Sequence, residues 1–335
     1  MIVLASDYKD QLINSYEVTK QAVIEGFCSG KSEIAEESDS NIRFYVEPYG
    51  TPRFWDILRE ADGLITAFIN VDDAFLEKAP KLKMISVNAT GYNSLDLDAL
   101  KRHGVAMSHI TSYCTREVSE HAITMMLALN KNLPQYADEI LVQKKWKYMD
   151  LPPRRTVDHL TVTIFGFGQI GRMTAKLANA IGAKVQAVDP YVKEEVAKEL
   201  NVTMVSPEEA LESSDVVINH MILNESTSNY FDKDFFQGLK RQSIFINVGR
   251  GGSVDEGALL DALKKGLICS AGLDVLADED PDIEKCPFAG MSNVILTPHS
   301  AFYSEDSNRA LEEISGRSMG MFLAGNIADI QGFIG

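Results

Sequence analysis

Three side chains capable of acid, base or anion-binding chemistry follow apolar runs late in the chain: Arg250, Glu279 and His299. An arginine guanidinium can hold a carboxylate through two parallel hydrogen bonds and polarise a neighbouring carbonyl. A histidine can deliver a proton to an oxygen that is becoming an alkoxide, and can remove it in the reverse direction. A carboxylate beside that histidine would favour the imidazolium and fix its orientation. These residue types therefore suit hydride transfer to a 2-oxo acid.

Each of the three residues also has an ordinary structural interpretation. Arg250 lies among glycines and could be a surface arginine in a tight turn. Glu279 lies in an acidic loop and could simply be solvated, and His299 could be a hydrogen-bonded histidine near a domain junction. The catalytic interpretation therefore depends on whether the chain also builds a cofactor site.

A glycine-rich turn in the middle of the chain predicts that site. An apolar run ends in a Gly-x-Gly-x-x-Gly turn, a helical run follows, and Asp189 closes the next apolar run. This order predicts a strand, a helix and a second strand that bind a dinucleotide pyrophosphate at the helix N-terminus. Asp189 can accept hydrogen bonds from ribose hydroxyls and would repel a 2′-phosphate, which favours NAD over NADP. Glycines also mark ordinary turns, so the flanking elements carry this prediction; the turn comprises Gly166, Phe167, Gly168, Gln169, Ile170 and Gly171.

Composition excludes several other classes of protein. The chain has 335 residues, of which 45% are hydrophobic and 24% charged, as in an ordinary globular protein of two domains. A formal net charge of −16 without a basic run argues against nucleic acid as a partner. No apolar stretch approaches the roughly 20 residues that a membrane-spanning helix needs. The four scattered cysteines predict neither a metal site nor a disulfide framework, and a reducing cytoplasm fits these features.

The elements that must position these residues are short strands alternating with helices, which predicts parallel sheets covered on both faces. In the first third we expect strands at residues 2–5, 42–46, 64–68, 84–87 and 105–107. We expect helices at 54–61, 72–78 and 95–103, the last capped by Ser94 and ended by Gly104. After the glycine turn, strands are expected at 184–188, 216–221, 244–248, 268–275 and 294–296.

The sequence therefore predicts an α/β protein with two doubly wound parallel-sheet domains. A Rossmann cofactor domain of about six strands (113–301) is inserted into a flavodoxin-like substrate domain (1–112 and 302–335), to which a last helix at 304–324 returns. The active site is expected at the carboxyl ends of the strands, where ligands bind in open α/β sheets.

A methionine-rich helix is expected between the two strand regions. Pro134 should end or kink it, and a second helical run covers residues 136–146. The apolar stripe on the methionine-rich helix predicts a buried helix face rather than a cofactor site. The region 117–146 lies outside the sheet pattern, so we expect it to form the contact of a homodimer. The residues at helical spacing are Val118, His121, Ala122, Met125, Met126 and Leu129.

Together, the motifs resemble those of the D-isomer-specific 2-hydroxyacid dehydrogenase family over nearly the whole chain, including a loop at residues 89–96. The resemblance implies an NAD-dependent enzyme that interconverts a 2-oxo acid and a D-2-hydroxy acid. The matching segments are residues 166–172, Asp189-Pro190-Tyr191, Asn247-Val248-Gly249-Arg250-Gly251-Gly252, Gly272-Leu273-Asp274-Val275 and Thr297-Pro298-His299.

The resemblance also implies a role for each matched residue. Arg250 would bind the substrate carboxylate and polarise the carbonyl, His299 would donate and accept the proton, and Glu279 would pair with His299. Further substrate contacts would come from the backbone N–H groups of Thr90 and Gly91, and from Tyr113 and Phe302. Besides the glycine turn, the cofactor would contact Asp189, Pro190, His220, Val248, Gly249 and Asp274, with Asp274 facing the nicotinamide carboxamide.

Several of these positions have alternatives or depart from the family pattern. Tyr113 could be a packing tyrosine at the domain hinge, and Phe302 could be core packing at the returning helix. Phe68 and Ile69 are further pocket candidates. Ile222 stands where the family usually has a proline, which puts the cofactor contacts of that loop in doubt.

The substrate cues conflict. The aromatic residues after His299 resemble the lactate-type and corepressor-like branches of the family, whereas residues 89–93 resemble glycerate dehydrogenases. Three functions therefore stay open: a D-2-hydroxyacid dehydrogenase of unspecified side chain, a hydroxypyruvate or glyoxylate reductase, and an NAD-sensing, corepressor-like binding protein. The presence of Arg250, Glu279 and His299 favours an enzyme.

Overall fold

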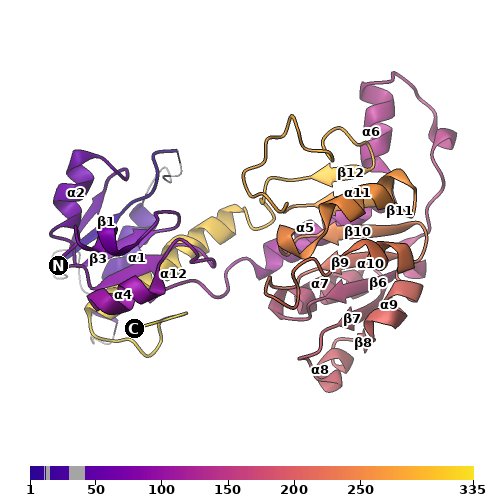
Figure 1. Cartoon of the computed structure of the whole chain (residues 1–335). Coiled ribbons are helices and arrows are strands. Elements are labelled where there is room, and N and C mark those ends of the chain that lie inside the picture. The colour runs from indigo at the N-terminus through magenta and orange to yellow at the C-terminus, as the bar shows by residue number, and fades with distance from the viewer. Residues whose placement is uncertain (11, 13–15, 30–41) are drawn as a thin grey trace. The chain divides into compact units, whose positions relative to one another are not determined.

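The structure is a computed structural model of the chain and describes residues 1–10, 12, 16–29 and 42–335 (Figure 1). The chain forms two compact units. Unit 1 comprises Met1–Tyr113 and Ser304–Gly335, and unit 2 comprises Cys114–Tyr303. The boundaries expected from the sequence differ from these by one residue at the first junction and by two at the second.

Unit 1 is built on a five-stranded parallel sheet in the order β2-β1-β3-β4-β5. This is the strand order of flavodoxin-like domains. The inner strands β3 and β4 are buried along their whole length, as expected where helices cover both faces. The strands are β1 Ile2–Ala5, β2 Arg43–Val46, β3 Gly63–Thr66, β4 Met84–Val87 and β5 Ala106–Ser108.

The last helix of the chain returns to unit 1 and packs along the first one (Figure 1). The two helices approach closely at glycines: a Cβ on Gly320 would lie 2.0 Å from the carbonyl oxygen of Val23. Ser86 of β4 donates a hydrogen bond to the carbonyl of Ser315, 2.9 Å away, which ties the helix to the sheet. The helices of this unit are α1 Glu17–Cys28, α2 Pro52–Leu58, α3 Asp73–Leu76, α4 Leu97–His103 and α12 Glu305–Leu323.

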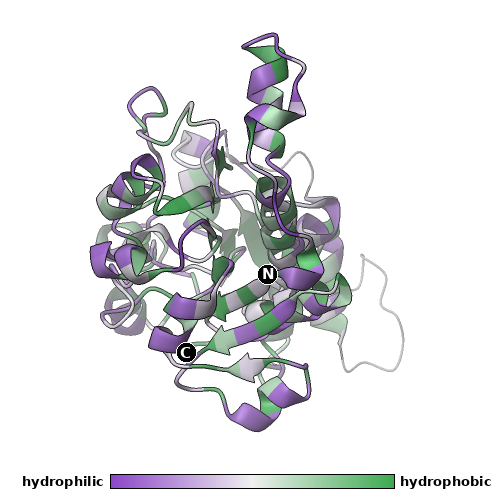
Figure 2. Ribbon diagram, turned by 90° about the vertical axis from the view of Figure 1, so that its right-hand side faces the viewer, coloured by the Kyte–Doolittle hydropathy of each residue, from purple (hydrophilic) through white to green (hydrophobic). Residues whose placement is uncertain are grey.

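Unit 2 is built on a seven-stranded parallel sheet in the order β12-β11-β10-β9-β6-β7-β8. In Figure 2 the strands are mostly coloured hydrophobic, whereas many helices have one hydrophilic and one hydrophobic side. The strands are β6 Thr161–Phe165, β7 Lys184–Val188, β8 Thr203–Met204, β9 Val216–Asn219, β10 Ser243–Asn247, β11 Ile268–Leu273 and β12 Val294–Leu296.

The helices of unit 2 cover this sheet. The stripe on α5 is buried in the core at Val118, Ala122, Met125, Met126 and Leu129, which confirms the prediction of a buried helix face. The α-helices are α5 Thr115–Asn130, α6 Leu133–Leu141, α7 Gln169–Ala180, α8 Glu194–Lys198, α9 Pro207–Ser213, α10 Lys233–Gly238 and α11 Glu256–Lys264. The 3₁₀ turns are η2 Tyr148–Asp150, η3 Val157–His159 and η4 Gly251–Ser253.

Two local predictions, a helix cap and the effect of a proline, are wrong. Asp96, not Ser94, caps α4, because its carboxylate accepts the N–H of Ala99 at 3.0 Å. Pro134 does not kink α5, which has already ended at Asn130; it lies in the first turn of α6, where a missing N–H costs nothing.

The structure also differs from the predicted elements in the extent of one helix, in one additional strand and in one additional helix. The helix expected at 136–146 ends at Leu141, so Trp146 lies outside it. The cofactor sheet has seven strands rather than about six, because β8 is only two residues long and too short to show a period. Helix α1 was not predicted from the sequence.

Candidate functional site

The side chains of His299 and Glu279 form a hydrogen-bonded pair. His299 Nδ1 lies 2.7 Å from Glu279 Oε2. Because an ionised carboxylate can only accept a hydrogen bond, Nδ1 carries a hydrogen, and Nε2 is the nitrogen left for proton transfer. The side chains are 45% and 55% exposed, so the pair is open to a small molecule.

The backbone of His299 is held in a strained conformation by Asp274. His299 has a φ of 49°, in the left-handed region, which costs a non-glycine residue about 1–3 kcal/mol. Its N–H donates to the carbonyl of Asp274 at 2.8 Å. The buried Asp274 carboxylate then accepts the N–H groups of Ser300 and Ala301, at 2.9 and 3.0 Å. These bonds fix the segment that carries His299.

A second histidine supports this arrangement from α5. His121 Nε2 lies 3.0 Å from Thr297 Oγ1, and the Thr297 hydroxyl donates to Asp274 Oδ1 at 2.5 Å. His121 Nε2 is also 3.7 Å from Asp274 Oδ1. Helical spacing predicts only that His121 lies on the buried stripe. The signal that could have identified its role is a titratable residue in an otherwise apolar helix face.

Arg250 is positioned by two asparagines at the ends of neighbouring strands. Asn247 ends β10, donates to the carbonyl of Arg250 at 3.1 Å, and accepts from Nδ2 of Asn219 at 2.9 Å. Ser253 donates to the same Arg250 carbonyl at 2.7 Å. The guanidinium is exposed and makes one hydrogen bond within the described chain, to the carbonyl of Gly249. Most of its donors therefore stay available to an anion.

Arg250, Glu279 and His299 follow three adjacent strands at the same edge of the sheet. Across β10, β11 and β12, Asn247 pairs with Leu273, and Leu273 pairs with Leu296. Arg250 and His299 each follow three residues after the end of their strand, and Glu279 follows β11. Adjacent parallel strands lie about 4.8 Å apart, so this register brings all three segments to the carboxyl edge.

The three glycines of the turn have different surroundings: two are packed against protein atoms and one is open. A Cβ on Gly166, whose φ is +88°, would lie 2.8 Å from the backbone of His220, and a Cβ on Gly171 would lie 2.2 Å from the Gly166 carbonyl oxygen. A Cβ on Gly168, the N-cap of α7, would meet nothing within 4 Å, and no side chain caps this helix. Protein packing therefore requires glycine at 166 and 171, and the open surface at 168 fits a pyrophosphate at the helix N-terminus.

Asp189 follows β7 and is tied to the glycine turn. Its carboxylate accepts the N–H of Phe167 at 2.8 Å and that of Tyr191 at 2.9 Å. Each carboxylate oxygen has a further lone pair for a ribose hydroxyl. The side chain of Phe167 lies in the core, so the turn offers its backbone rather than this ring to a ligand.

His220 follows β9 and packs behind the turn. Its Nε2 lies 2.9 Å from Thr174 Oγ1, and its buried Nδ1 has no hydrogen-bond partner in the described chain. Burial lowers the pKa of His220 from 6.5 to about 3, because a charged ring would lose its hydration there. The ring is therefore neutral at physiological pH.

The remaining pocket candidates fall into two groups. In unit 1, Thr90, Gly91 and Phe68 are exposed, whereas Ile69 is fully buried in the core and cannot line a pocket. Tyr113 is half-buried at the last position of the first stretch of unit 1.

In unit 2, Phe302 lies edge-on to His299, with ring centroids 6.3 Å apart, and also packs against the core. The later cofactor candidates differ in exposure: Val248 and Gly249 are buried, and Pro190 is exposed.

Comparison with known proteins decides the family. The family profile described as D-isomer specific 2-hydroxyacid dehydrogenase, NAD binding domain, matches residues 123–301. A glycerate dehydrogenase of Methylorubrum extorquens is 33% identical, over 87% of this chain and 94% of that protein. The chain belongs to the D-isomer-specific 2-hydroxyacid dehydrogenase family. Its cofactor is NAD, and unit 2 contains the NAD-binding domain of the family.

Further members of the family differ in the substrate that their names give. A glyoxylate reductase of Korarchaeum cryptofilum is 29% identical, over 89% of this chain and 90% of that protein. The D-lactate dehydrogenase of Aquifex aeolicus, solved with NAD and lactic acid, is 25% identical, with a TM-score of 0.78 over 100% of this chain and 99% of that one. These dehydrogenases share the two-domain α/β architecture predicted from the sequence.

The described residues contain no helix that is both long and apolar enough to cross a membrane. They contain no group of three or more histidine, cysteine or acidic residues placed to hold a metal ion.

Proposed function

We propose that this dehydrogenase reduces a 2-oxo acid to a D-2-hydroxy acid, with Arg250, Glu279 and His299 as its catalytic residues. The observation that carries the proposal is the His299–Glu279 pair, held with an exposed Arg250 at one sheet edge. NADH supplies the hydride when it is bound. Arg250 binds the substrate carboxylate and polarises the carbonyl that receives this hydride.

The protein's own part in the reaction is a proton transfer. Glu279 accepts the Nδ1 hydrogen of His299 and stabilises the ring when it is doubly protonated. His299 then gives the Nε2 proton to the forming alkoxide and takes it back in the oxidation direction. The backbone N–H groups of Thr90 and Gly91 are proposed to bind the same carboxylate. Tyr113 and Phe302 are proposed to contact the rest of the substrate.

A narrower candidate is reduction of hydroxypyruvate or glyoxylate. The names of the glycerate dehydrogenase and glyoxylate reductase relatives favour it. The lactate dehydrogenase neighbour and Phe302 beside His299 instead favour an apolar side chain.

The deciding experiment is an NADH-oxidation assay with glyoxylate, hydroxypyruvate, pyruvate and 4-methyl-2-oxopentanoate. We expect turnover of at least one acid, and D-configured product by chiral chromatography. If none is turned over while NADH still binds, the enzyme proposal is wrong and an NAD-sensing role takes its place. The ratio of kcat/KM among the acids then ranks the side chains.

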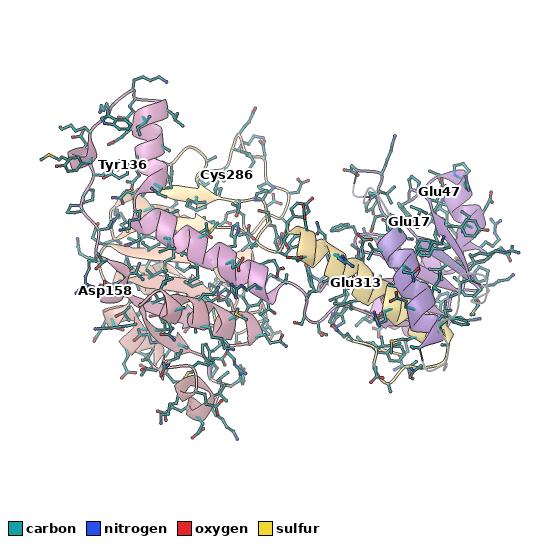
Figure 3. All side chains as sticks on the ribbon, turned by 180° about the vertical axis from the view of Figure 1, so that it is seen from behind. Glu17, Glu47, Tyr136, Asp158, Cys286 and Glu313 are labelled. Carbon is teal, nitrogen blue, oxygen red and sulfur yellow. The ribbon has the colours of Figure 1, made fainter. Side chains whose placement is uncertain are left out.

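We also propose that the protein forms a homodimer through the α6 surface. Helix α6 and the loop after it project from unit 2 (Figures 1 and 3, where Tyr136 labels α6), and this surface carries several exposed apolar residues. Trp146 is 89% exposed, and a cluster of this kind is typical of a protein–protein contact. The cluster is Leu133, Ile140, Leu141, Val142, Trp146, Tyr148 and Met149.

Sedimentation equilibrium tests this contact. The wild type is expected to be a dimer, and Leu141→Asp with Trp146→Asp is expected to be a monomer. Ile283→Asp, which places a charge on an exposed apolar residue of another loop, should stay dimeric. A dimeric double variant would place the interface elsewhere.

A further inference from the structure

His109 contacts the middle of the loop that is proposed to bind the substrate carboxylate. It follows β5, and its Nδ1 lies 3.0 Å from the carbonyl oxygen of Thr90. Because a carbonyl can only accept, Nδ1 is the donor. The ring also packs on Tyr92, with centroids 4.6 Å apart. One side chain therefore holds the loop on both sides of Gly91.

The loop is anchored on either side of Thr90 and Gly91: Ala89 and Tyr92 pack against the core, and the Leu95 N–H donates to the carbonyl of Tyr92 at 3.0 Å. Its start is fixed where Ile110 N–H donates to the carbonyl of Ala89 at 3.0 Å, and its end is fixed where Val71 N–H donates to the carbonyl of Ser94 at 2.9 Å. Between these bonds Thr90 and Gly91 are exposed, and a Cβ on Gly91 would meet nothing within 4 Å. We therefore expect the hydrogen bond from His109 to Thr90 to set the orientation of these two N–H groups.

A segment that follows α12 packs against the opposite side of His109. Ile334 exchanges two backbone hydrogen bonds with Met107 of β5, at 2.7 and 2.8 Å, so the segment runs antiparallel along this edge strand. His109 N–H donates to the carbonyl of Gly332 at 3.3 Å. A Cβ on Gly332, whose φ is +54°, would lie 2.4 Å from Cδ2 of His109, 2.5 Å from its carbonyl oxygen and 2.7 Å from its Nε2. The backbone of Gly332 therefore lies directly against the imidazole.

We propose that His109 and Gly332 are positioning residues for substrate binding. The segment at 331–334 keeps the His109 ring against Thr90 and Tyr92, and the ring sets the N–H groups of Thr90 and Gly91 that bind the carboxylate. The proposal rests on the proposed function of that loop. In this proposal, His109 and Gly332 connect the segment near residue 332 to the loop near residue 90. Both residues affect substrate binding without touching the substrate.

The chain offers a matched pair of glycine substitutions as a test. Gly332→Ala adds a methyl group that collides with both the ring and the carbonyl oxygen of His109. Gly325→Ala adds the same methyl group at another left-handed glycine after α12, with φ +80°, where a Cβ meets nothing within 4 Å. Both variants bear the backbone strain, and only Gly332→Ala disturbs His109.

Steady-state kinetics with NADH and the best 2-oxo acid give the first readout. We expect Gly332→Ala to raise KM for the acid about five- to tenfold, the effect of one weakened hydrogen bond, with kcat and the NADH dissociation constant nearly unchanged. Gly325→Ala should keep the wild-type KM. His109→Phe, which keeps a ring but loses the donor, should raise KM, and His109→Asn, which keeps a donor at this position, should raise it less. Equal KM values for Gly332→Ala and Gly325→Ala would overturn the proposal.

Hydrogen exchange gives a second readout that needs no turnover. The amides of Thr90 and Gly91 should exchange faster in Gly332→Ala and in His109→Phe than in the wild type or Gly325→Ala. Unchanged exchange overturns the positioning role even if the enzyme is active. If the two variants exchange faster than the wild type but the wild type reduces no 2-oxo acid, the positioning role of His109 is supported and the proposed function is wrong.

Discussion

Asp274 holds His299 in place through both its backbone and its side chain. Its carbonyl accepts the His299 N–H at 2.8 Å, and its carboxylate accepts the two N–H groups that follow His299 in sequence. Because His299 has a φ of 49°, the segment would relax without these bonds. Asp274 thus has a structural role in holding His299. Its contact with the nicotinamide, which the family resemblance implies, stays a prediction.

Replacing Asp274 with asparagine should weaken both folding and turnover. The amide nitrogen cannot accept an N–H, so one buried donor in the segment 299–301 loses its partner, at a cost of about 1–3 kcal/mol. We expect a lower free energy of unfolding in urea and a lower kcat. Glu284→Gln, which neutralises an exposed acid in the preceding loop, should change neither. A fully stable and active Asp274→Asn would show that the hydrogen bonds of this carboxylate do not hold His299.

His299→Ala should abolish most of the turnover while NADH binding persists. Loss of a general acid lowers kcat by about 10²- to 10⁴-fold. NADH fluorescence titration should give a dissociation constant close to that of the wild type, which serves as the control for folding. Wild-type turnover in this variant would remove His299 as the acid.

Arg250→Lys should separate charge from geometry. Lysine keeps the positive charge but cannot make two parallel hydrogen bonds to a carboxylate. We expect KM for the 2-oxo acid to rise and kcat to fall, together lowering kcat/KM by at least about tenfold. Arg241→Lys, at an exposed position before β10, is the control and should be neutral. If Arg250→Lys is equally neutral, the carboxylate is bound elsewhere.

Asp189→Ala should relax the preference for NADH over NADPH. The wild-type carboxylate favours ribose hydroxyls and repels a 2′-phosphate. Its removal should lower the ratio of kcat/KM for NADH to that for NADPH by about tenfold or more, equivalent to about 1.4 kcal/mol. The variant also loses acceptors for the N–H groups of Phe167 and Tyr191, so NADH should bind more weakly as well. An unchanged ratio would contradict the ribose assignment.

His220 should make the protein less stable in acid. The unfolded ring binds a proton below about pH 6.5, whereas burial lowers its folded pKa to about 3. The contribution of the neutral, buried His220 to the free energy of unfolding is therefore complete above about pH 6.5. It is lost as pH falls towards 3, at up to about 1.4 kcal/mol per pH unit. Urea unfolding of the wild type and His220→Gln between pH 7 and pH 4 should give free energies that converge as pH falls. Parallel curves would show that the folded ring takes up the proton freely.

Much of the site was predictable because its signals are local. A turn such as Gly166 to Gly171 needs particular backbone conformations at fixed spacing, and the order of strand, helix, strand and acid around it follows from short-range periodicity. Strands β1, β4, β7 and β12 were predicted with their observed bounds for the same reason.

The tertiary structure decided what depends on groups far apart in the chain. No spacing in the sequence indicates that Asp274 holds the segment of His299 through hydrogen bonds. The same is true of the contact between His121 and Thr297 and of that between Gly332 and His109. Hydrogen bonds of this kind form between loops that strand order and helix packing bring together, and they leave no period in the sequence. The sequence by itself determined the fold class and the residues proposed to carry the chemistry, because these signals are local. The packed fold decided which polar groups hold those residues in place.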